Sequence, residues 1–179
     1  MAFEDTEAGR SYAAVTDIEK IAKERNFEII KCHFRAHDVS KEETEAGIIK
    51  CAAELAPKID AFYITISSGI TPKSLPKILD PMNAHKIPTF SQSGSDEVRH
   101  GVLLSVAAPD FRLLGMFHAE IIGKIINGAK PCELDQVFAL PMKSAFNAAT
   151  AKKISLKSEI YDLLLHSSVE IYKETEVSK

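Results

Sequence analysis

A hydroxyl-rich segment follows a short apolar and β-branched run at residues 61–66. This run is typical of a strand that is buried on both faces of a sheet. It ends at Ser67 and Ser68, and Thr71 stands three residues further on. Ligands of open α/β sheets bind beyond the carboxyl ends of such strands. Ser67, Ser68 and Thr71 are therefore predicted to offer hydroxyl groups to a small polar ligand.

Polar side chains recur at three other predicted strand ends. They are Asp5 and Thr6, then Ser93 and Asp96 within the segment 91–96, and finally Asp110 within the segment 108–110. Because the carboxyl ends of parallel strands share one edge of a sheet, we expect these side chains to form a single rim. Capping of a nearby helix explains each residue equally well when it is taken alone. The recurrence of such residues at one edge favours a binding site.

Catalytic and metal-binding patterns are weak in this sequence. Cys32-His33 and His37-Asp38 contain zinc-ligand types, but neighbours in a strand point to opposite faces and no second Cys/His pair completes a site. The residues between Ser93 and His100 lack a G-x-S-x-G elbow, and no glycine-rich phosphate loop occurs. We therefore predict no catalytic residue, metal or cofactor.

The overall composition is that of an ordinary globular protein. The chain has 179 residues, of which 45% are hydrophobic and 26% charged, and this length favours one domain. A net charge of -3 provides no basic surface for nucleic acid. Neither a membrane span nor an export signal is visible in the sequence. The three cysteines are odd in number and widely spaced, which argues against a disulfide framework.

Strand and helix patterns alternate along the chain. Met1–Phe3 is too short to predict a strand, and we expect that a first strand has been cut away. Strands are predicted at 27–33, 61–66, 87–90 and 102–107, and further extended segments at 137–140 and 144–146. Helices are predicted at 12–22, 40–55, 72–82, 96–100, 109–125, 148–153 and 158–173. This alternation predicts an α/β fold with a three-layer, Rossmann-like parallel sheet.

Several segments, taken in order, resemble a known family. They are 59–68, His85-Lys86-Ile87-Pro88, 96–103, 110–115, 125–131 and 146–153. This succession is similar to the C-terminal lobe of ABC-transporter substrate-binding proteins with a type I periplasmic-binding fold, a group that includes tryptophan- and tyrosine-binding members. The resemblance covers nearly the whole chain.

The resemblance implies a binding role without catalysis. It implies residues 1–142 as the C-terminal α/β lobe, and 143–179 as a return strand and helices that would pack on an absent N-terminal lobe. The expected role is the solute-binding component of an ABC importer, located outside the cytoplasm, with a permease as partner. Ser67 and Ser68 stand where the family commonly has an Asp-Asn pair, which removes a partner for an α-amino group. Asp110 aligns with an acidic position that opens the long helix.

A single lobe cannot enclose a ligand as two lobes do. We therefore expect a fragment, a truncated product or self-association, with a homodimer formed through the apolar side of the last helix at Ile160, Leu163, Leu164 and Val169. Two alternatives remain open at this point. One is a ligand-sensing regulatory module with the same fold, and the other is a small flavodoxin-like enzyme.

Overall fold

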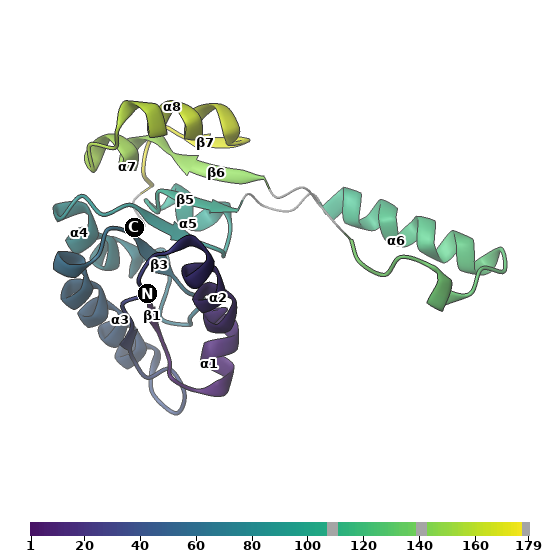
Figure 1. Cartoon of the computed structure of the whole chain (residues 1–179), viewed down its shortest axis with the longest axis horizontal. Helices are drawn as coiled ribbons and strands as arrows, with labels where there is room; N and C mark the ends of the chain where they lie inside the picture. Colours follow the sequence, from purple (N-terminus) through teal and green to yellow (C-terminus); the bar gives the residue numbers. More distant parts are fainter. Residues whose placement is uncertain (107–110, 139–142, 177–179) are drawn as a thin grey trace.

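A seven-stranded sheet forms the centre of the molecule (Figure 1). The computed structural model describes residues 1–106, 111–138 and 143–176. The strand order is β2-β1-β3-β4-β5-β6-β7. The strands are β1 (Ala2–Phe3), β2 (Cys32–His33), β3 (Phe62–Ile64), β4 (Thr89–Ser91), β5 (Leu104–Val106), β6 (Ser144–Asn147) and β7 (Glu170–Tyr172).

The first five strands run parallel, as the sequence predicts. Their carboxyl ends therefore lie at one edge of the sheet. The expectation of a wholly parallel sheet is wrong at β6, which runs antiparallel to β5. A parallel neighbour needs a crossover that passes over the sheet. The helix between these two strands, α6 (Phe111–Ile126), lies away from the sheet and does not supply that crossover (Figure 1).

The other helices agree with the sequence pattern in most places. They are α1 (Glu7–Tyr12), α2 (Val15–Arg25), α3 (Lys41–Leu55), α4 (Leu75–Ala84), α5 (Ser95–Arg99), α7 (Ala148–Lys153) and α8 (Ser158–Ser167), together with the 3₁₀ turns η1 (Ala56–Lys58) and η2 (Pro131–Glu133). Ser40 and Glu43 have the sequence spacing of a capping box, and in the structure they exchange both of its hydrogen bonds at the start of α3. Among the described helices, none has the length and apolar character that crossing a membrane requires.

Three predicted elements differ from the structure. The single helix at 12–22 is divided into α1 and α2, because Ala14 adopts a left-handed conformation with φ 50°. The helix at 158–173 ends at Ser167, and residues 170–172 form the strand β7 instead. Ala2–Phe3 is a strand after all, because its backbone pairs with both β2 and β3. A two-residue strand shows no periodicity that a sequence pattern can reveal.

Helices cover both faces of the sheet, which gives the expected three layers. On one face, Phe62 and Ile64 of β3 pack against α3 and α4 in the largest buried cluster. On the other face, Phe3 and Tyr63 pack against the start of α2 at Val15. The alternation of side chains along β3 therefore determines which helices lie on which face.

The last part of the chain joins the same sheet. Asn147 is fully buried at the end of β6, where its side-chain nitrogen donates to the carbonyl oxygen of Val98 at 2.7 Å. Its side-chain oxygen accepts a hydrogen bond from the backbone nitrogen of Thr150 at 2.8 Å and so caps α7. These bonds attach β6 and α7 to α5. The division of the chain at residue 142, and the packing of 143–179 on a further lobe, remain predictions.

A disulfide joins Cys32 of β2 to Cys51 of α3. The prediction of no disulfide framework, based on the odd number and wide spacing of the cysteines, is therefore wrong for this pair. The structure brings the edge strand over α3, so that two residues 19 positions apart in sequence meet in space. Cys132 remains free and exposed.

We expect loss of this disulfide to destabilise the protein measurably. Closing a loop of this length restricts the unfolded chain, and such cross-links typically contribute about 2–4 kcal/mol. Urea unfolding of Cys32→Ala should show a decrease of that order in the free energy of unfolding. Cys132→Ala is the matched control and should unfold like the parent protein. Equal stability of the Cys32→Ala protein and its parent would contradict a structural disulfide.

Candidate functional site

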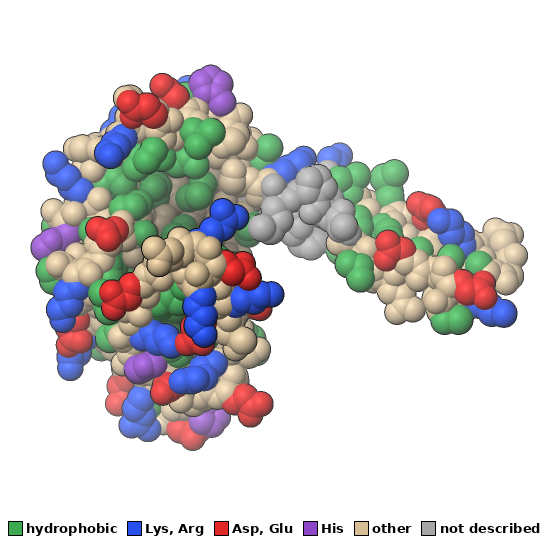
Figure 2. Space-filling model, in the orientation of Figure 1, with side chains coloured by type: hydrophobic (Ala, Val, Ile, Leu, Met, Phe, Trp, Pro, Cys, Tyr) green, Lys and Arg blue, Asp and Glu red, His purple; other side chains and the backbone are tan. Residues whose placement is uncertain are grey.

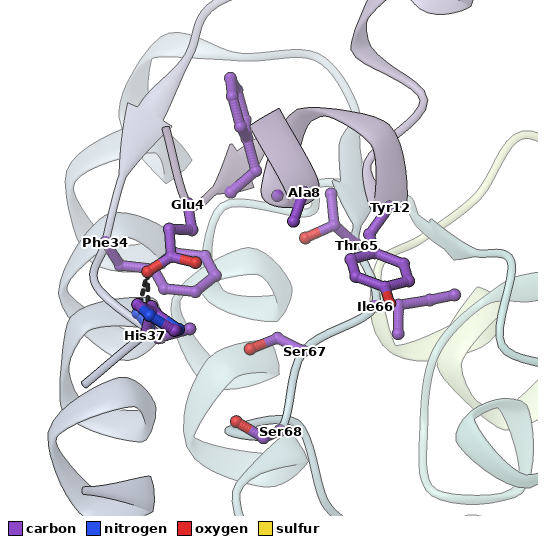
Figure 3. A pocket seen from close by; sticks show the side chains of 12 residues that line it. Glu4, Ala8, Tyr12, Phe34, His37, Thr65, Ile66, Ser67 and Ser68 are labelled. Carbon is purple, nitrogen blue, oxygen red and sulfur yellow. Dashed lines mark hydrogen bonds between the residues drawn. The ribbon is translucent and has the colours of Figure 1, made fainter. Parts of the chain in front are cut away.

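A cavity of about 290 Å³ lies where β1, β2 and β3 end (Figure 3). Its walls come from the segments after these three strands and from α1. The lining residues are Phe3, Glu4, Ala8, Gly9, Tyr12, Phe34, Ala36, His37, Thr65, Ile66, Ser67 and Ser68. The cavity therefore lies at the carboxyl edge of the parallel sheet, where α/β folds bind ligands.

The Glu4 carboxylate connects two of these segments. Its Oε1 accepts hydrogen bonds from the backbone nitrogens of Ala36 at 2.7 Å and His37 at 2.6 Å. These bonds lower the pKa of Glu4 below its usual value, and the bond from Ala36 has the largest effect. Among the described residues, the other oxygen receives only the Thr6 hydroxyl, at a long 3.4 Å. The Oε1 atom of the carboxylate therefore holds the loop after β2 in place. The Oε2 atom retains capacity to accept further hydrogen bonds.

The segment after β3 supplies the hydroxyl groups. Thr65 is buried, and its hydroxyl donates to the carbonyl oxygen of Ala2 at 2.8 Å, which holds the end of β3 against β1. Ser67 is half-buried and Ser68 is exposed. Figure 3 shows both serine side chains pointing toward the side of the cavity where His37 lies. Within the described part of the chain, the Ser68 hydroxyl has no hydrogen-bond partner, so it is available to a ligand.

Aromatic side chains complete the walls. Phe34 is buried beside Glu4, while the ring of Tyr12 stands across the cavity and is 63% exposed (Figure 3). The carbonyl oxygen of Tyr12 accepts a hydrogen bond from the side-chain nitrogen of Gln92 at 2.8 Å, which ties the end of α1 to the segment after β4. The cavity thus combines apolar ring surface with hydroxyl, imidazole and carboxylate groups.

Only some of the residues predicted from sequence gather at this cavity. Ser67 and Ser68 line it. Thr6 lines an adjoining depression and caps α1 by accepting from the backbone nitrogen of Gly9 at 3.0 Å. Asp5 pairs with Arg10 at 2.7 Å. Thr71 exchanges hydrogen bonds with Ser74 before α4 and lines a separate groove along α3.

The predicted residues after β4 lie elsewhere. Ser93 is exposed, and it stands four residues before Glu97, whose pKa is raised by burial. Asp96 is exposed beside His100. Neither residue lines the cavity at β1, β2 and β3. Asp110 lies outside the described residues, so its predicted role stays a prediction.

Sequence reasoning did not assign Tyr12, Phe34 or His37 to a binding site. His37 follows the predicted strand 27–33, so the strand-end rule that selected Ser67 applies equally to it. Tyr12 appears in the sequence as part of an apolar helical stripe, whereas in the structure it ends α1 before the break at Ala14 and its ring is exposed. The sequence position of Glu4, just before a helix, indicates no more than a favourable interaction with the helix dipole, whereas its carboxylate accepts from a loop more than 30 residues away. Among the described residues, no cluster of His, Cys, Asp and Glu could hold a metal ion.

Comparison with family models matches residues 9–170 to the family described as ABC transporter substrate binding protein. Comparison with curated protein sequences gave no match.

Three solved structures share the fold at low sequence identity. A substrate-binding protein with adhesive properties from Clostridium difficile, in a ligand-free, open structure, is 19% identical with a TM-score of 0.70, over 98% of this chain and 53% of its own. An ABC domain from Streptococcus pneumoniae in complex with L-Trp is 17% identical with a TM-score of 0.62, over 95% and 54%. A conserved domain protein from Vibrio cholerae is 16% identical with a TM-score of 0.63, over 95% and 53%. The chain therefore spans about half the length of these structures.

The hydrogen bonds to Glu4 predict a dependence of stability on pH. The pKa of Glu4 is lower in the folded state than in the unfolded chain. Its ionised carboxylate therefore stabilises the folded protein at pH values above the usual pKa of a carboxyl group, and this stabilisation is lost as the pH falls through the folded-state pKa. In thermal unfolding experiments, the melting temperature should therefore decrease less between pH 7 and pH 3 for Glu4→Gln than for the parent protein. At pH 7 the variant should be less stable by at most about 1 kcal/mol, because solvent screens this exposed carboxylate.

Glu7→Gln is the matched control, since Glu7 is an exposed glutamate three residues further along, at the start of α1. It should reproduce the parent's pH profile. Parallel profiles for Glu4→Gln and the parent would show that the Glu4 carboxylate does not hold the loop after β2.

Proposed function

Because the chain belongs to the ABC transporter substrate binding protein family, we propose that it binds a small polar or amino-acid-like solute at the carboxyl edge of its sheet. The observation that carries this proposal is the cavity between Glu4, Tyr12, His37 and Ser67-Ser68. It is built from three neighbouring strand ends and presents convergent polar groups beside an aromatic wall. These are the features expected of a small-molecule site.

The groups in the cavity favour a ligand with a polar end and an apolar end. Ser67 and Ser68 each provide a hydroxyl that donates and accepts, which suits a carboxylate or hydroxyl group. The ring of Tyr12 suits an apolar or aromatic part of the ligand. The structure from Streptococcus pneumoniae that contains L-Trp supports an amino acid as one ligand class to test here.

Glu4 is the group in this cavity best suited to an ammonium group. The family's common Asp-Asn pair is replaced by Ser67-Ser68, so the residues after β3 supply no negative charge. The less occupied oxygen of Glu4 supplies one instead, since in the part of the chain that the structure describes its one hydrogen bond is the long one from Thr6. Glu4 is therefore proposed to orient an amino group at the opposite wall from the serines.

The wider role is proposed from the family. A substrate-binding protein of an ABC importer delivers its solute to a permease, and we propose this partner and a location outside the cytoplasm for this chain. The Cys32–Cys51 disulfide supports that location, because disulfides persist in oxidising compartments. A binding role requires no catalytic group. Because the chain spans about half of its structural relatives, ligand enclosure would need a second surface over the cavity.

Ligand binding should depend on the cavity residues in a graded way. A thermal-shift screen with the free amino acids and small polar metabolites should find a compound that raises the melting temperature. For that compound, Tyr12→Ala should weaken binding at least about tenfold through loss of ring contact. Ser68→Ala should weaken it about 2- to 10-fold through loss of one hydrogen bond. Isothermal titration calorimetry measures both effects.

Thr71→Ala and Ser93→Ala are matched controls, because both remove a hydroxyl from a strand-end segment outside the cavity. They should bind the compound as the parent does. Equal weakening by Ser93→Ala and Ser68→Ala would place the ligand elsewhere on the rim. Unchanged binding in both of these variants would contradict the proposed site.

A further inference from the structure

The loop that follows β2 forms one wall of the candidate cavity through Phe34, Ala36 and His37. β2 has two residues and lies at the edge of the sheet, next to β1. Beyond it, the backbone nitrogen of Phe34 reaches the carbonyl oxygen of Phe3 at a long 3.3 Å. Strand pairing this short is marginal by itself. Charged side chains gather on the outer surface around α1 and α3 (Figure 2), so the wall must be held mainly from its inner side.

The helix α3 makes these inner contacts along one of its sides. Cys51 of α3 is bonded to Cys32 of β2. Gly47 lies four residues before Cys51, and a Cβ atom at this glycine would be 2.9 Å from the Cβ atom of Phe34. Positions four apart lie on the same side of a helix, and positions two apart lie on the same side of an extended chain. The disulfide and the Gly47–Phe34 contact are therefore two successive connections between the same two surfaces.

Another wall of the cavity lies against the same helix. Gly69 directly follows Ser67-Ser68, which line the cavity. A Cβ atom at Gly69 would lie 2.9 Å from the Cγ2 atom of Thr44 and 2.9 Å from the backbone nitrogen of Glu45. Thr44 is buried three residues before Gly47, so this contact continues the same side of α3. α3 therefore supports both walls, and its bond to β2 fixes one wall relative to the other.

The disulfide is the one covalent connection among these contacts, and thiols can reverse it. Cys51 is 2% exposed, whereas Cys32 is half-buried on the edge strand, so the Sγ atom of Cys32 is the accessible one. A thiolate of a dithiol reductant attacks this atom, forms a mixed disulfide and expels the Cys51 thiolate, which takes up a proton. The second thiol of the reductant then closes its own disulfide and releases Cys32 as a thiol. The dithiol thus supplies both electrons.

We propose that the Cys32–Cys51 disulfide is a redox-dependent constraint on the ligand site. The oxidised chain holds residues 34–37 in their binding position, and reduction releases this loop and weakens binding. This inference rests on the proposed function, because it assumes a ligand in the cavity. A released wall has to become ordered when the ligand binds, which lowers the affinity. Because disulfides persist in oxidising compartments, the chain has its full affinity only in such a compartment.

Isothermal titration calorimetry with a compound that stabilises the protein tests this constraint. After incubation with dithiothreitol, the parent should bind the compound at least about fivefold more weakly, since Phe34 and His37 then become ordered only on binding. The double variant Cys32→Ser/Cys51→Ser should bind equally weakly with and without the reductant. Reoxidation should restore the affinity of the parent. Cys132→Ser is the matched control and should respond to the reductant as the parent does, because Cys132 is free and exposed.

Hydrogen–deuterium exchange without ligand separates this constraint from a general loss of stability. Within the first minutes, reduction should speed up exchange of the backbone amides at 32–37, while the amides of β3 and β4 remain protected. Loss of protection throughout the sheet on this time scale, unchanged exchange at 32–37, or equal affinity of the oxidised and reduced parent would each overturn the inference alone. Failure of every compound to bind the oxidised parent would instead overturn the proposed function, and the inference with it.

Discussion

The parallel alignment of β1 with β2 and β3 is the constraint on which the candidate site depends. β1 has only two residues, and yet it lies between the other two strands and pairs with both. Two side chains strengthen this arrangement beyond the strand ends. Thr65 bonds to the backbone of Ala2, and Glu4 bonds to the loop after β2. Because the three strands point the same way, residues from three distant parts of the chain meet at one edge.

The rim of the sheet divides into two parts with different chemistry. At the ends of β4 and β5 the hydroxyls satisfy one another: Ser91 and Ser105 are hydrogen-bonded at 3.0 Å, and Ser105 also accepts from the backbone nitrogen of Gly94. These groups stabilise the loop after β4. At the ends of β1 to β3, Ser68 and one oxygen of Glu4 retain hydrogen-bonding capacity beside a cavity, whereas after β4 the Oε2 atom of Glu97 is buried and lacks a hydrogen-bond partner within the described ranges. A polar strand end is therefore insufficient evidence of a binding residue; unsatisfied donors and acceptors beside a cavity are the stronger criterion.

The sequence pattern was sufficient for features that depend on local chemistry. The apolar run before Ser67 forms the strand β3, and the capping-box spacing of Ser40 and Glu43 begins α3. Features that depend on distant contacts were not predictable. The disulfide requires β2 to lie against α3, and the antiparallel direction of β6 depends on where α6 lies. The role of Glu4 likewise appears only when the loop at residue 36 is placed beside it in space.

The central claim is that a small solute occupies the edge formed by β1, β2 and β3. Mapping of backbone amide chemical shifts by NMR during titration with a compound that stabilises the protein tests it most directly. The account predicts saturable shifts concentrated at residues 4–12, 34–37 and 65–68, with the groove beside Thr71 unaffected. Shifts confined to the groove between α3 and α4, or to the segment after β4, would contradict it.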